Sequence, residues 1–433
     1  MKRIGLDIGT TTISGAVVDT DSGQALTVRT VSNESFIKTS REWERIQDIE
    51  QIVSTAKAVL DELTGLYPDV QSIGLTGQMH GIVYVDQEGE GVSPLYTWQD
   101  GRGNLPGPDG KTLADDLRDR GLRASSGYGL TTHLYNCQNG MVPDGSASFC
   151  TIGDYFGMKL TGRKTPLVHV SNGASLGCFD CKKGDFKRDQ LRDLGVDLSL
   201  LPEVSWELCK LGSYRGIPVM AAIGDNQASF LGSVGMQAGA ALVNMGTGGQ
   251  ISLLSDQYFE APGIEARPLK KGKYLLVGSS LCGGRAYAAL ERFFKSYVSA
   301  AGGKETPQYD VMARLAEKMT ADEDRIKVVT TFCGTRVDPG KRGSIRNISI
   351  DNFTPEGLII GVLTGMAQEL YDLYDVIHKG TGIKAGRLVA SGNGFRKNPV
   401  LQRVFCRMFE ADLTLAPYEE EAACGAAAGR LLL

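Results

Sequence analysis

Two segments of this 433-residue chain share one residue pattern, which points to a duplicated fold. The sequence VNMGTGGQISLL (243–254) repeats LDIGTTTISGAV (6–17) in residue type and order. Asp7 corresponds to Asn244 at an offset of 237 residues, and the Gly-Thr pair that follows each of them keeps the same offset. Each copy predicts a strand, a Gly-Thr turn and a second strand, so we expect two related domains.

The chain length agrees with two domains, because single hydrophobic cores stop growing at roughly 250–300 residues. We place the boundary so that the expected domains are 1–232 and 233–433. Apolar runs at 4–7, 13–19 and 26–31 predict an antiparallel meander, and residues 41–66 have the apolar spacing of a helix. An apolar strand over 219–223 leads directly to Asp225.

The second half continues with alternating patterns of both kinds, which predict a mixed α/β pair of domains facing each other across a cleft. Helices are expected at 283–299, 307–319, 355–378, 398–409 and 420–431, and strands at 274–278, 327–331 and 387–391.

Composition narrows the functional classes. The 46 Lys+Arg and 50 Asp+Glu residues give a formal net charge of −4 without long blocks of one sign, which argues against nucleic-acid and membrane-surface partners. The N-terminus lacks a signal-peptide pattern and no run of 18 apolar residues occurs, so a cytoplasmic protein is expected. Nine scattered cysteines fit reduced thiols, and the single pair Cys178-x-x-Cys181 does not predict a zinc site.

The two Gly-Thr turns, at 9–12 and 246–249, are candidate phosphate sites. Successive N–H groups in a turn can cradle an anion, and small residues let phosphate oxygens approach the backbone. Neither the GxxxxGK[ST] motif nor a GxGxxG motif in its usual context occurs. A single such hairpin would be read as an ordinary tight turn, but two related copies favour a nucleotide site.

Two aspartates are candidates for the chemistry. Asp7 and Asn244 hold the same place in the two repeats, but only Asp7 carries a charge. A single carboxylate suits Mg²⁺ bound through water by one of the two domains. The alternative is that Asp7 is a turn residue whose hydrogen bonds are satisfied within the protein. Asp225 stands at the carboxyl end of a strand, where it could accept a proton from an attacking hydroxyl. The alternative for Asp225 is a helix N-cap.

Residues 390–402 (ASGNGFRKNPVLQ) predict a strand, a glycine turn and a helix capped by Asn398, with Pro399 at its first position. A close turn of this kind could hold a flat adenine ring against the backbone, although alone it would be an ordinary helix start.

Eight collinear blocks resemble the FGGY carbohydrate kinases of the actin/Hsp70-like superfamily, whose domains are ribonuclease H-like. They are LDIGTTTISG (6–15), GLTGQMHG (74–81), TWQDGR (97–102), SNGASLGCFD (171–180), GDNQAS (224–229), MGTGGQIS (245–252), FCGTRVDPGKRGS (332–344) and SGNGFRKN (391–398). The resemblance implies two domains with a cleft between them, ATP and Mg²⁺ as cofactors, and a small sugar as substrate. It leaves the oligomeric state open, a homodimer being one option.

Carried over to this sequence, the resemblance implies that Asp225 is the general base and that Asp7 organises Mg²⁺ through water. The residues implied for the nucleotide are Gly9, Thr10, Thr11, Thr12, Gly246, Thr247, Gly283, Gly284, Gly392, Asn393 and Asn398. The residues that match positions lining or supporting the sugar site are Gln78, Met79, His80, Trp98, Asp100, Arg102, Tyr128 and Asn226; for His80 and Tyr128 the alternative is packing.

Within the family, TWQDGR, GLTGQMHG and the segment GYGLTTHLYN (127–136) are most similar to the sedoheptulose kinases, and the GQMHG block is shared with xylulose kinases. The implied reaction is phosphorylation of the terminal primary hydroxyl of a ketose. A second hypothesis is an actin-like ATP-binding switch or chaperone, which has no use for the sugar blocks. A third is an iron–sulfur ATPase activator, for which the cysteine pair is the only argument.

Overall fold

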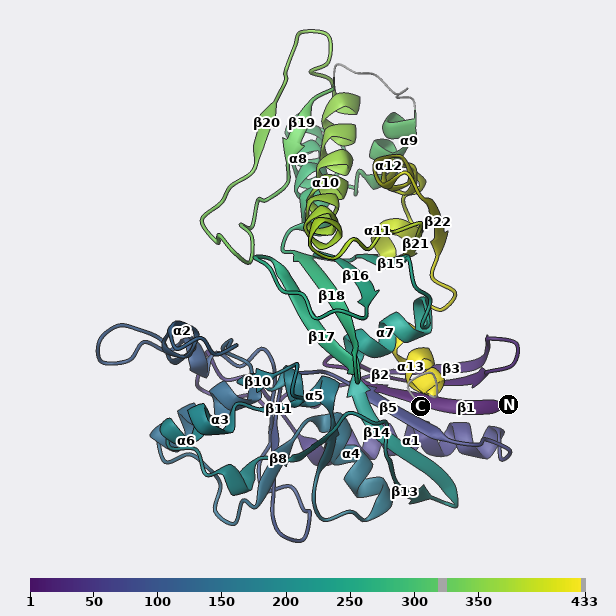
Figure 1. The fold of residues 1–433 in the computed structure, drawn as a ribbon. Helices are drawn as coiled ribbons and strands as arrows, with labels where there is room; N and C mark the ends of the chain where they lie inside the picture. The colour runs from purple at the N-terminus through teal and green to yellow at the C-terminus, as the bar shows by residue number, and fades with distance from the viewer. Residues whose placement is uncertain (318–324, 430–433) are drawn as a thin grey trace. The chain divides into compact units, whose positions relative to one another are not determined.

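The computed structural model describes residues 1–317 and 325–429, and the chain divides into two compact units (Figure 1). Unit 1 comprises Met1–Met236, Arg267–Gly272 and Pro417–Leu433, and unit 2 comprises Gln237–Ala266 and Lys273–Ala416. Each unit is built on its own six-stranded mixed sheet, with helices packed on it. The predicted α/β fold class is confirmed.

The sheet of unit 1 begins with the predicted antiparallel meander and continues with parallel strands. Its order is β13 (Lys210–Tyr214), β14 (Ile217–Gly224), β5 (Ile73–Gly77), β1 (Lys2–Ile8), β2 (Thr12–Asp19) and β3 (Gln24–Ser32). β1 pairs antiparallel with β2 and parallel with β5, which in turn pairs parallel with β14. The carboxyl ends of β1, β5 and β14 therefore meet at one edge of the sheet.

The sheet of unit 2 repeats this arrangement. Its order is β17 (Ile264–Lys270), β18 (Lys273–Ser280), β16 (Gly249–Ser255), β15 (Ala240–Met245), β21 (Arg387–Ser391) and β22 (Asp412–Leu415), and residues 267–270 of β17 are counted with unit 1. β15 pairs antiparallel with β16 and parallel with β21, as β1 does with β2 and β5. Asp7 pairs with Thr76 of β5, and Asn244 pairs with Ser391 of β21, so the two repeated residues hold equivalent sheet positions.

Helices cover both faces of the unit 1 sheet. α1 (Ile49–Leu66) and α4 (Ile152–Thr161) share one apolar core with β1, β5 and β14. On the other face α13 (Glu421–Ala427) packs its alanines against Ala16 and Val18 of β2 (Figure 1). Gly5 leaves room for this helix, because a Cβ at Gly5 would lie 1.8 Å from the Ala423 carbonyl oxygen.

The two units do not follow the single division expected from the sequence. The boundary expected after residue 232 lies close to the Met236/Gln237 division, but Pro417–Leu433 joins unit 1. Sequence patterns do not reveal this, because α13 is short and its partner strands lie about 400 residues earlier. The expected helix at 420–431 is seen as Glu421–Ala427, and positions 430–431 lie outside the described residues.

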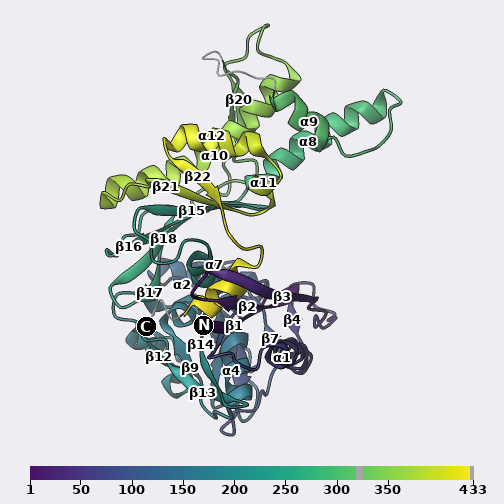
Figure 2. The same cartoon turned by 90° about the vertical axis from the view of Figure 1, so that its right-hand side faces the viewer.

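In unit 2, α10 (Pro355–Thr381) and α12 (Pro399–Phe409) cover one face of the sheet (Figure 2). α8 (Gly283–Ala300), α9 (Tyr309–Glu317) and the short α11 (Asn393–Arg396) complete the set around the site described below. α9 was expected at 307–319, of which 318–319 lie outside the described residues. Asn398 caps α12 as predicted, its Oδ1 accepting from the Leu401 N–H at 3.0 Å.

One predicted helix begins later than expected. The helical pattern of 41–66 is wrong over its first turns, because Asp48 caps α1 by accepting from the Glu50 and Gln51 N–H groups. The residues just before the cap form β4 (Ile46–Gln47), which pairs antiparallel with β7 (Leu95–Tyr96).

The remaining elements are short. They are β6 (Val83–Val85), α2 (Leu113–Asp119), α3 (Gly129–Gln138), β8 (Ser148–Cys150), β9 (Leu167–His169), α5 (Val170–Ser175), β10 (Phe179–Asp180), β11 (Asp185–Phe186), α6 (Arg188–Asp193), β12 (Glu203–Ser205), α7 (Asp225–Ser233), β19 (Lys327–Val329), β20 (Ser344–Arg346) and two 3-10 turns, Arg102–Asn104 and Leu198–Leu200. Within residues 1–317 and 325–429, none of the helices combines the length and apolar character that a bilayer span requires.

Candidate active site

The turn after β1 is arranged as an anion cradle. Its carbonyl groups are tied back by other segments: Asn33 Nδ2 donates to the Gly9 carbonyl at 2.9 Å and Gln47 Nε2 donates to the Thr10 carbonyl at 3.0 Å. The Thr11 carbonyl accepts from the Asn33 N–H at 2.8 Å. In the described part of the chain the N–H groups of Gly9, Thr10 and Thr11 donate to no acceptor, so the turn presents three donors.

In unit 2, the carbonyl groups of the turn after β15 are likewise engaged by another segment. The Gly246 carbonyl accepts from the Gly284 N–H at 3.0 Å, and the Thr247 carbonyl accepts from the Arg285 N–H at 3.1 Å. Among the described residues, the N–H groups of Thr247 and Gly248 have no acceptor. The turn covers 246–248 and is one residue shorter than its counterpart, because Gly249 already pairs with Met245 in the β15–β16 ladder.

Gly283 explains how α8 reaches this turn. Its φ is +31°, and a Cβ there would lie 2.2 Å from the Gly248 carbonyl carbon. Only glycine fits so close an approach. Gly283 therefore lets the first turn of α8 seat against the Gly-Thr turn, which is how the N–H of Gly284 comes to hold the Gly246 carbonyl.

Burial and two neighbouring carboxylates of unit 1 act on Asp7, near the carboxyl end of β1. Burial, with further contributions from the carboxylates of Asp225 and Glu420, raises the pKa of Asp7 to about 7. Burial also raises the pKa of Asp225 to about 6, although Arg267 and the Asn226 N–H act in the opposite direction. Asp225 is thus poised as a base near neutral pH.

Side chains hold the backbone immediately before Asp225. Asn172 Nδ2 donates to the Ala222 carbonyl at 3.1 Å, and Thr76 Oγ1 donates to the Ile223 carbonyl at 2.8 Å. The Gly224 N–H donates to Ser171 Oγ at 2.9 Å. All three side chains are buried. These side chains hold the last residues of β14, on the side where pairing with β13 ends at Met220.

Asp225 is the first residue of α7, and Gly224 is the N-cap. The N-cap alternative for Asp225 is therefore wrong. The carboxylate is partly buried and sits at the positive end of the helix dipole, where a negative charge is favoured.

Four of the predicted sugar residues lie close to the β1 turn or to Asp225. Gln78, directly after β5, is buried and accepts from Thr10 Oγ1 at 3.3 Å, while Trp98 Nε1 donates to the same Thr10 oxygen at 2.9 Å. Met79 touches Gly224, since a Cβ placed there would lie 2.6 Å from the Met79 methyl. Asn226 follows Asp225, and its Oδ1 is buried with no partner in the described chain.

His80 and Tyr128 stack on each other. Their ring centroids are 4.4 Å apart and the planes differ by 3°. His80 has a φ of +75°, and its Nδ1 lies 2.7 Å from the Ser175 carbonyl oxygen. These contacts hold a strained residue at the start of the loop after Gln78, and the predicted sugar contact stays a prediction.

Asp100 and Arg102 form a buried ion pair. Arg102 Nε lies 2.7 Å from Asp100 Oδ1, and both side chains are fully buried. Arg102 also donates to Asn136 Oδ1 at 2.5 Å and packs its guanidinium 4.3 Å from the centroid of the Tyr96 ring. The Arg45 N–H donates to Asp100 Oδ2 at 3.1 Å. The pair fixes the loop that carries Trp98.

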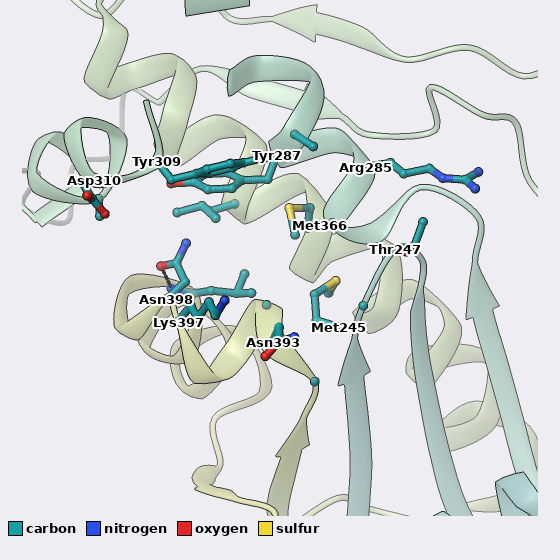
Figure 3. A pocket seen from close by; sticks show the side chains of 18 residues that line it. Met245, Thr247, Arg285, Tyr287, Tyr309, Asp310, Met366, Asn393, Lys397 and Asn398 are labelled. Atoms are coloured by element: carbon teal, nitrogen blue, oxygen red, sulfur yellow. Dashed lines mark hydrogen bonds between the residues drawn. The ribbon is translucent and has the colours of Figure 1, made fainter. Parts of the chain in front are cut away.

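Unit 2 contains a cavity of about 890 Å³ beside the β15 turn (Figure 3). It is lined by Met245, Gly246, Thr247, Gly284, Arg285, Tyr287, Ala288, Tyr309, Asp310, Ala313, Leu363, Met366, Gly392, Asn393, Gly394, Lys397, Asn398 and Leu401. The rings of Tyr287 and Tyr309 lie on one side and Asn393, Lys397 and Asn398 on the other. The two tyrosine rings are 5.9 Å apart and inclined by 30°.

The cavity gathers the predicted nucleotide residues of this unit, except Gly283. Gly392 has a φ of +86°, and a Cβ would lie 2.8 Å from the Met245 carbonyl oxygen, so glycine is required there. The sequence did not reveal Tyr287 and Tyr309. Aromatic residues in an amphipathic helix are more often core residues. The signal that could have found Tyr287 is its place just after the two glycines of α8, whereas Tyr309 begins α9 and has no such signal.

The Asp7 site fits a hydrated divalent cation. Its Oδ1 is buried and has no hydrogen-bond partner among the described residues, so it is available to a ligand. One carboxylate next to a set of phosphate-binding N–H groups is a donor set that Mg²⁺ accepts, the remaining positions being filled by water and phosphate oxygens.

The sequence matches agree with this geometry. Residues 3–132 match the N-terminal domain of the FGGY family of carbohydrate kinases, and residues 241–429 match its C-terminal domain. The chain belongs to the FGGY family. It is therefore an ATP-dependent carbohydrate kinase, and the resemblance found in the sequence blocks is confirmed.

Relatives match this FGGY kinase over nearly its full length. Sedoheptulokinase from Mus musculus is 27% identical over 98% of this chain and 96% of its own. Among solved structures, xylulose kinase from Rhodospirillum rubrum has a TM-score of 0.84 at 22% identity, covering 99% of this chain and 89% of its own. Plasmodium falciparum glycerol kinase with ADP has a TM-score of 0.80 at 18% identity, with coverages of 99% and 88%. These likenesses to solved structures support the fold.

Proposed function

We propose that this FGGY kinase transfers the γ-phosphoryl group of ATP to the terminal primary hydroxyl of sedoheptulose, forming sedoheptulose 7-phosphate. The observation that carries the proposal is the environment of the Asp225 carboxylate. Asp225 is a partly buried carboxylate at the start of α7, its pKa is raised to about 6, and three buried side chains hold the backbone before it.

Each group in unit 1 has a role in this reaction. Asp225 accepts the proton of the attacking hydroxyl, a contribution typically worth on the order of 10²–10⁴ in rate. The N–H groups of Gly9, Thr10 and Thr11 donate to the phosphoryl oxygens, where charge is spread in the transition state. Thr12, which is exposed at the start of β2, contributes its hydroxyl at the same place.

The cavity of unit 2 receives the nucleotide. Gly246 and Thr247 hold the phosphates, and the adenine lies between the tyrosine wall and the backbone at Gly392. Asp7 would hold Mg²⁺ through water, and the cation would neutralise charge on the phosphates. The glycerol kinase structure with ADP supports a nucleotide role for this fold.

The choice of sugar rests on the sequence blocks and on one relative. Trp98 of the TWQDGR block and Gln78 of the GLTGQMHG block hydrogen-bond to Thr10 of the β1 turn, and the sedoheptulokinase of Mus musculus is 27% identical over 98% of this chain. Xylulose or another pentulose is the second candidate substrate, favoured by the likeness to the Rhodospirillum rubrum xylulose kinase.

A coupled ADP-release assay tests the proposal. Sedoheptulose, D-xylulose, D-ribulose, glycerol and no sugar are compared for the wild type and for Asp225→Asn. We expect the highest kcat/KM with sedoheptulose, and a fall on the order of 10²–10⁴ in kcat for the variant with nucleotide binding retained. A higher kcat/KM with xylulose would move the assignment to a pentulose kinase. Equal ATP hydrolysis without sugar would favour an actin-like switch.

A further inference from the structure

Thr10, Gln78 and Gln47 of unit 1 form a closed hydrogen-bonded ring at the β1 turn, and Trp98 donates to it from outside. Trp98 Nε1 donates to Thr10 Oγ1 at 2.9 Å, and Thr10 Oγ1 donates to Gln78 Oε1 at 3.3 Å. Gln78 Nε2 donates to Gln47 Oε1 at 2.8 Å, and Gln47 Nε2 donates back to the Thr10 carbonyl at 3.0 Å. The ring joins the phosphate turn to two predicted sugar contacts through Gln47, a residue that the motifs do not contain.

The direction of each bond in the ring is fixed. An indole N–H can only donate, so Thr10 Oγ1 must accept from Trp98 and must point its own hydrogen elsewhere. Gln47 donates to a carbonyl, which sets its amide orientation and turns its Oε1 toward the Gln78 amide nitrogen. Gln78 therefore turns its Oε1 toward Thr10. The Thr10 hydrogen is thus committed to Gln78.

Burial and sheet pairing make Gln47 the fixed member of the ring. Its side chain is fully buried, and it lies in β4, opposite Leu95 of β7, three residues before Trp98. The side chain of Trp98, by contrast, is 47% exposed, so a ligand can reach the indole. The Thr10–Gln78 bond is the longest of the four, beyond the usual 2.7–2.8 Å of an O–H···O bond, and so costs least to exchange.

We propose that Gln47 is a positioning residue that withholds the Thr10 hydroxyl from phosphate until a sugar hydroxyl binds Gln78. This inference rests on the proposed function, in which Gln78 contacts the sugar and Thr10 the phosphoryl group. A sugar hydroxyl that donates to Gln78 Oε1 competes with Thr10, and the released Thr10 hydrogen turns to the phosphoryl oxygen. Without sugar the Thr10 hydroxyl keeps donating to Gln78, so it does not stabilise the phosphoryl group and phosphoryl transfer to water is slow.

The variant Gln47→Met tests this coupling, because methionine keeps the length of glutamine and removes both of its hydrogen bonds. Sugar-independent ATP hydrolysis and sugar-dependent turnover are measured on the same preparations. We expect the ratio of hydrolysis to sugar phosphorylation to rise about 10-fold, the effect of losing one net hydrogen bond, and KM for the sugar to rise. ADP binding, measured by calorimetry, stays as in the wild type.

Asn33→Ala is the matched control. Asn33 holds the Gly9 carbonyl of the same turn at 2.9 Å but touches neither Gln78 nor Trp98 in the described hydrogen bonds. We expect this variant to lower kcat without raising the hydrolysis ratio. If both variants raise the ratio equally, the turn is merely loosened and the role of Gln47 is refuted.

A second variant, Trp98→Phe, covers the case in which Gln47→Met does not fold. It removes the indole N–H together with the smaller ring of a half-exposed residue, and it should also raise the hydrolysis ratio, because Thr10 then loses its donor and can rotate. An unchanged ratio in the folded variants, with ketose-dependent turnover in the wild type, overturns the coupling and leaves the kinase assignment standing. Absence of ketose-dependent turnover in the wild type overturns the proposed function itself.

Discussion

Burial is what makes Asp225 able to take a proton near neutral pH, because surroundings of low dielectric constant disfavour the charged carboxylate. Burial raises its pKa to about 6 and, with neighbouring carboxylates, raises the pKa of Asp7 to about 7. We expect kcat/KM to rise with pH through about 6–7 and to level off above it, measured between pH 5 and 9 with saturating nucleotide. A profile flat down to pH 5 would contradict a base with this pKa.

The same burial predicts a stability gain when the charge is removed. A carboxyl whose pKa is higher folded than unfolded favours the folded state at low pH, and that contribution is lost as pH rises through about 6. Asp225→Asn should therefore raise the unfolding free energy by about 1–3 kcal/mol at pH 8 and by little at pH 4. Urea unfolding at both pH values measures this difference. Asp189→Asn, at a carboxylate that is 93% exposed, should show no such pH-dependent gain.

At the scale of the element, the junction of β14 and α7 is held by side chains on the side where β13 no longer pairs with β14. Ser171→Ala leaves the buried Gly224 N–H without its acceptor, which costs about 1–3 kcal/mol of unfolding free energy. Because this N–H directly precedes Asp225, kcat should also fall by about 10-fold, and KM for ATP should not change. Thermal unfolding and the coupled assay measure the two effects together.

Ser148→Ala provides the comparison. Ser148 is a similarly buried serine of unit 1, and its hydroxyl donates to the Leu200 carbonyl at 2.9 Å, away from α7. It should lose stability without a comparable loss of kcat. Equal losses of kcat in both variants would mean that stability alone, and not the position of Asp225, sets the rate.

Local sequence patterns predicted the elements whose start or turn is determined by residues nearby in the sequence. The hairpin of β1 and β2 and the cap at Asn398 were predictable because the turn residues and the capping side chain lie within a few residues of the elements they start. The start of α1 was not, because the apolar spacing continues through residues that instead pair with β7. For the same reason Gln47 escaped notice. Its function depends on partners 37 and 31 residues away, which no motif records.

The candidate site shows the same limit. The blocks named the two turns and both aspartates, but the groups that orient them are distant in sequence. Asn33 and Gln47 turn the carbonyls of the first turn away, and α8 does so for the second. A turn becomes an anion cradle only when its carbonyls are engaged elsewhere, and that condition is a property of the tertiary structure.

At the scale of the whole molecule, the proposed function assigns each substrate to one unit of the duplication. The proposed base and the predicted sugar contacts all belong to unit 1, and every residue that lines the proposed nucleotide cavity belongs to unit 2. The repeat keeps the hairpin and its parallel neighbour in both units, but it replaces Asp7 by Asn244, whose Nδ2 donates to Ser391 Oγ at 2.9 Å. The carboxylate is thus present only in unit 1, and in unit 2 the side chain at the same position links β15 to β21.

This division predicts that the two binding functions can be lost separately. Tyr287→Leu removes an aromatic ring from the cavity wall, and base–aromatic stacking is worth about 1–3 kcal/mol, so ADP affinity should fall about 10-fold or more. The matched control is Tyr297→Leu, on the same helix but 73% exposed and not part of the cavity. Calorimetry with ADP and with sugar should show weaker ADP binding and unchanged sugar binding in Tyr287→Leu, and neither loss in Tyr297→Leu. Asp225→Asn should bind ADP as the wild type does, because Asp225 lies outside the unit that contains the proposed nucleotide cavity. Loss of sugar affinity in Tyr287→Leu, or of ADP affinity in Asp225→Asn, would show that the two units do not bind their substrates independently.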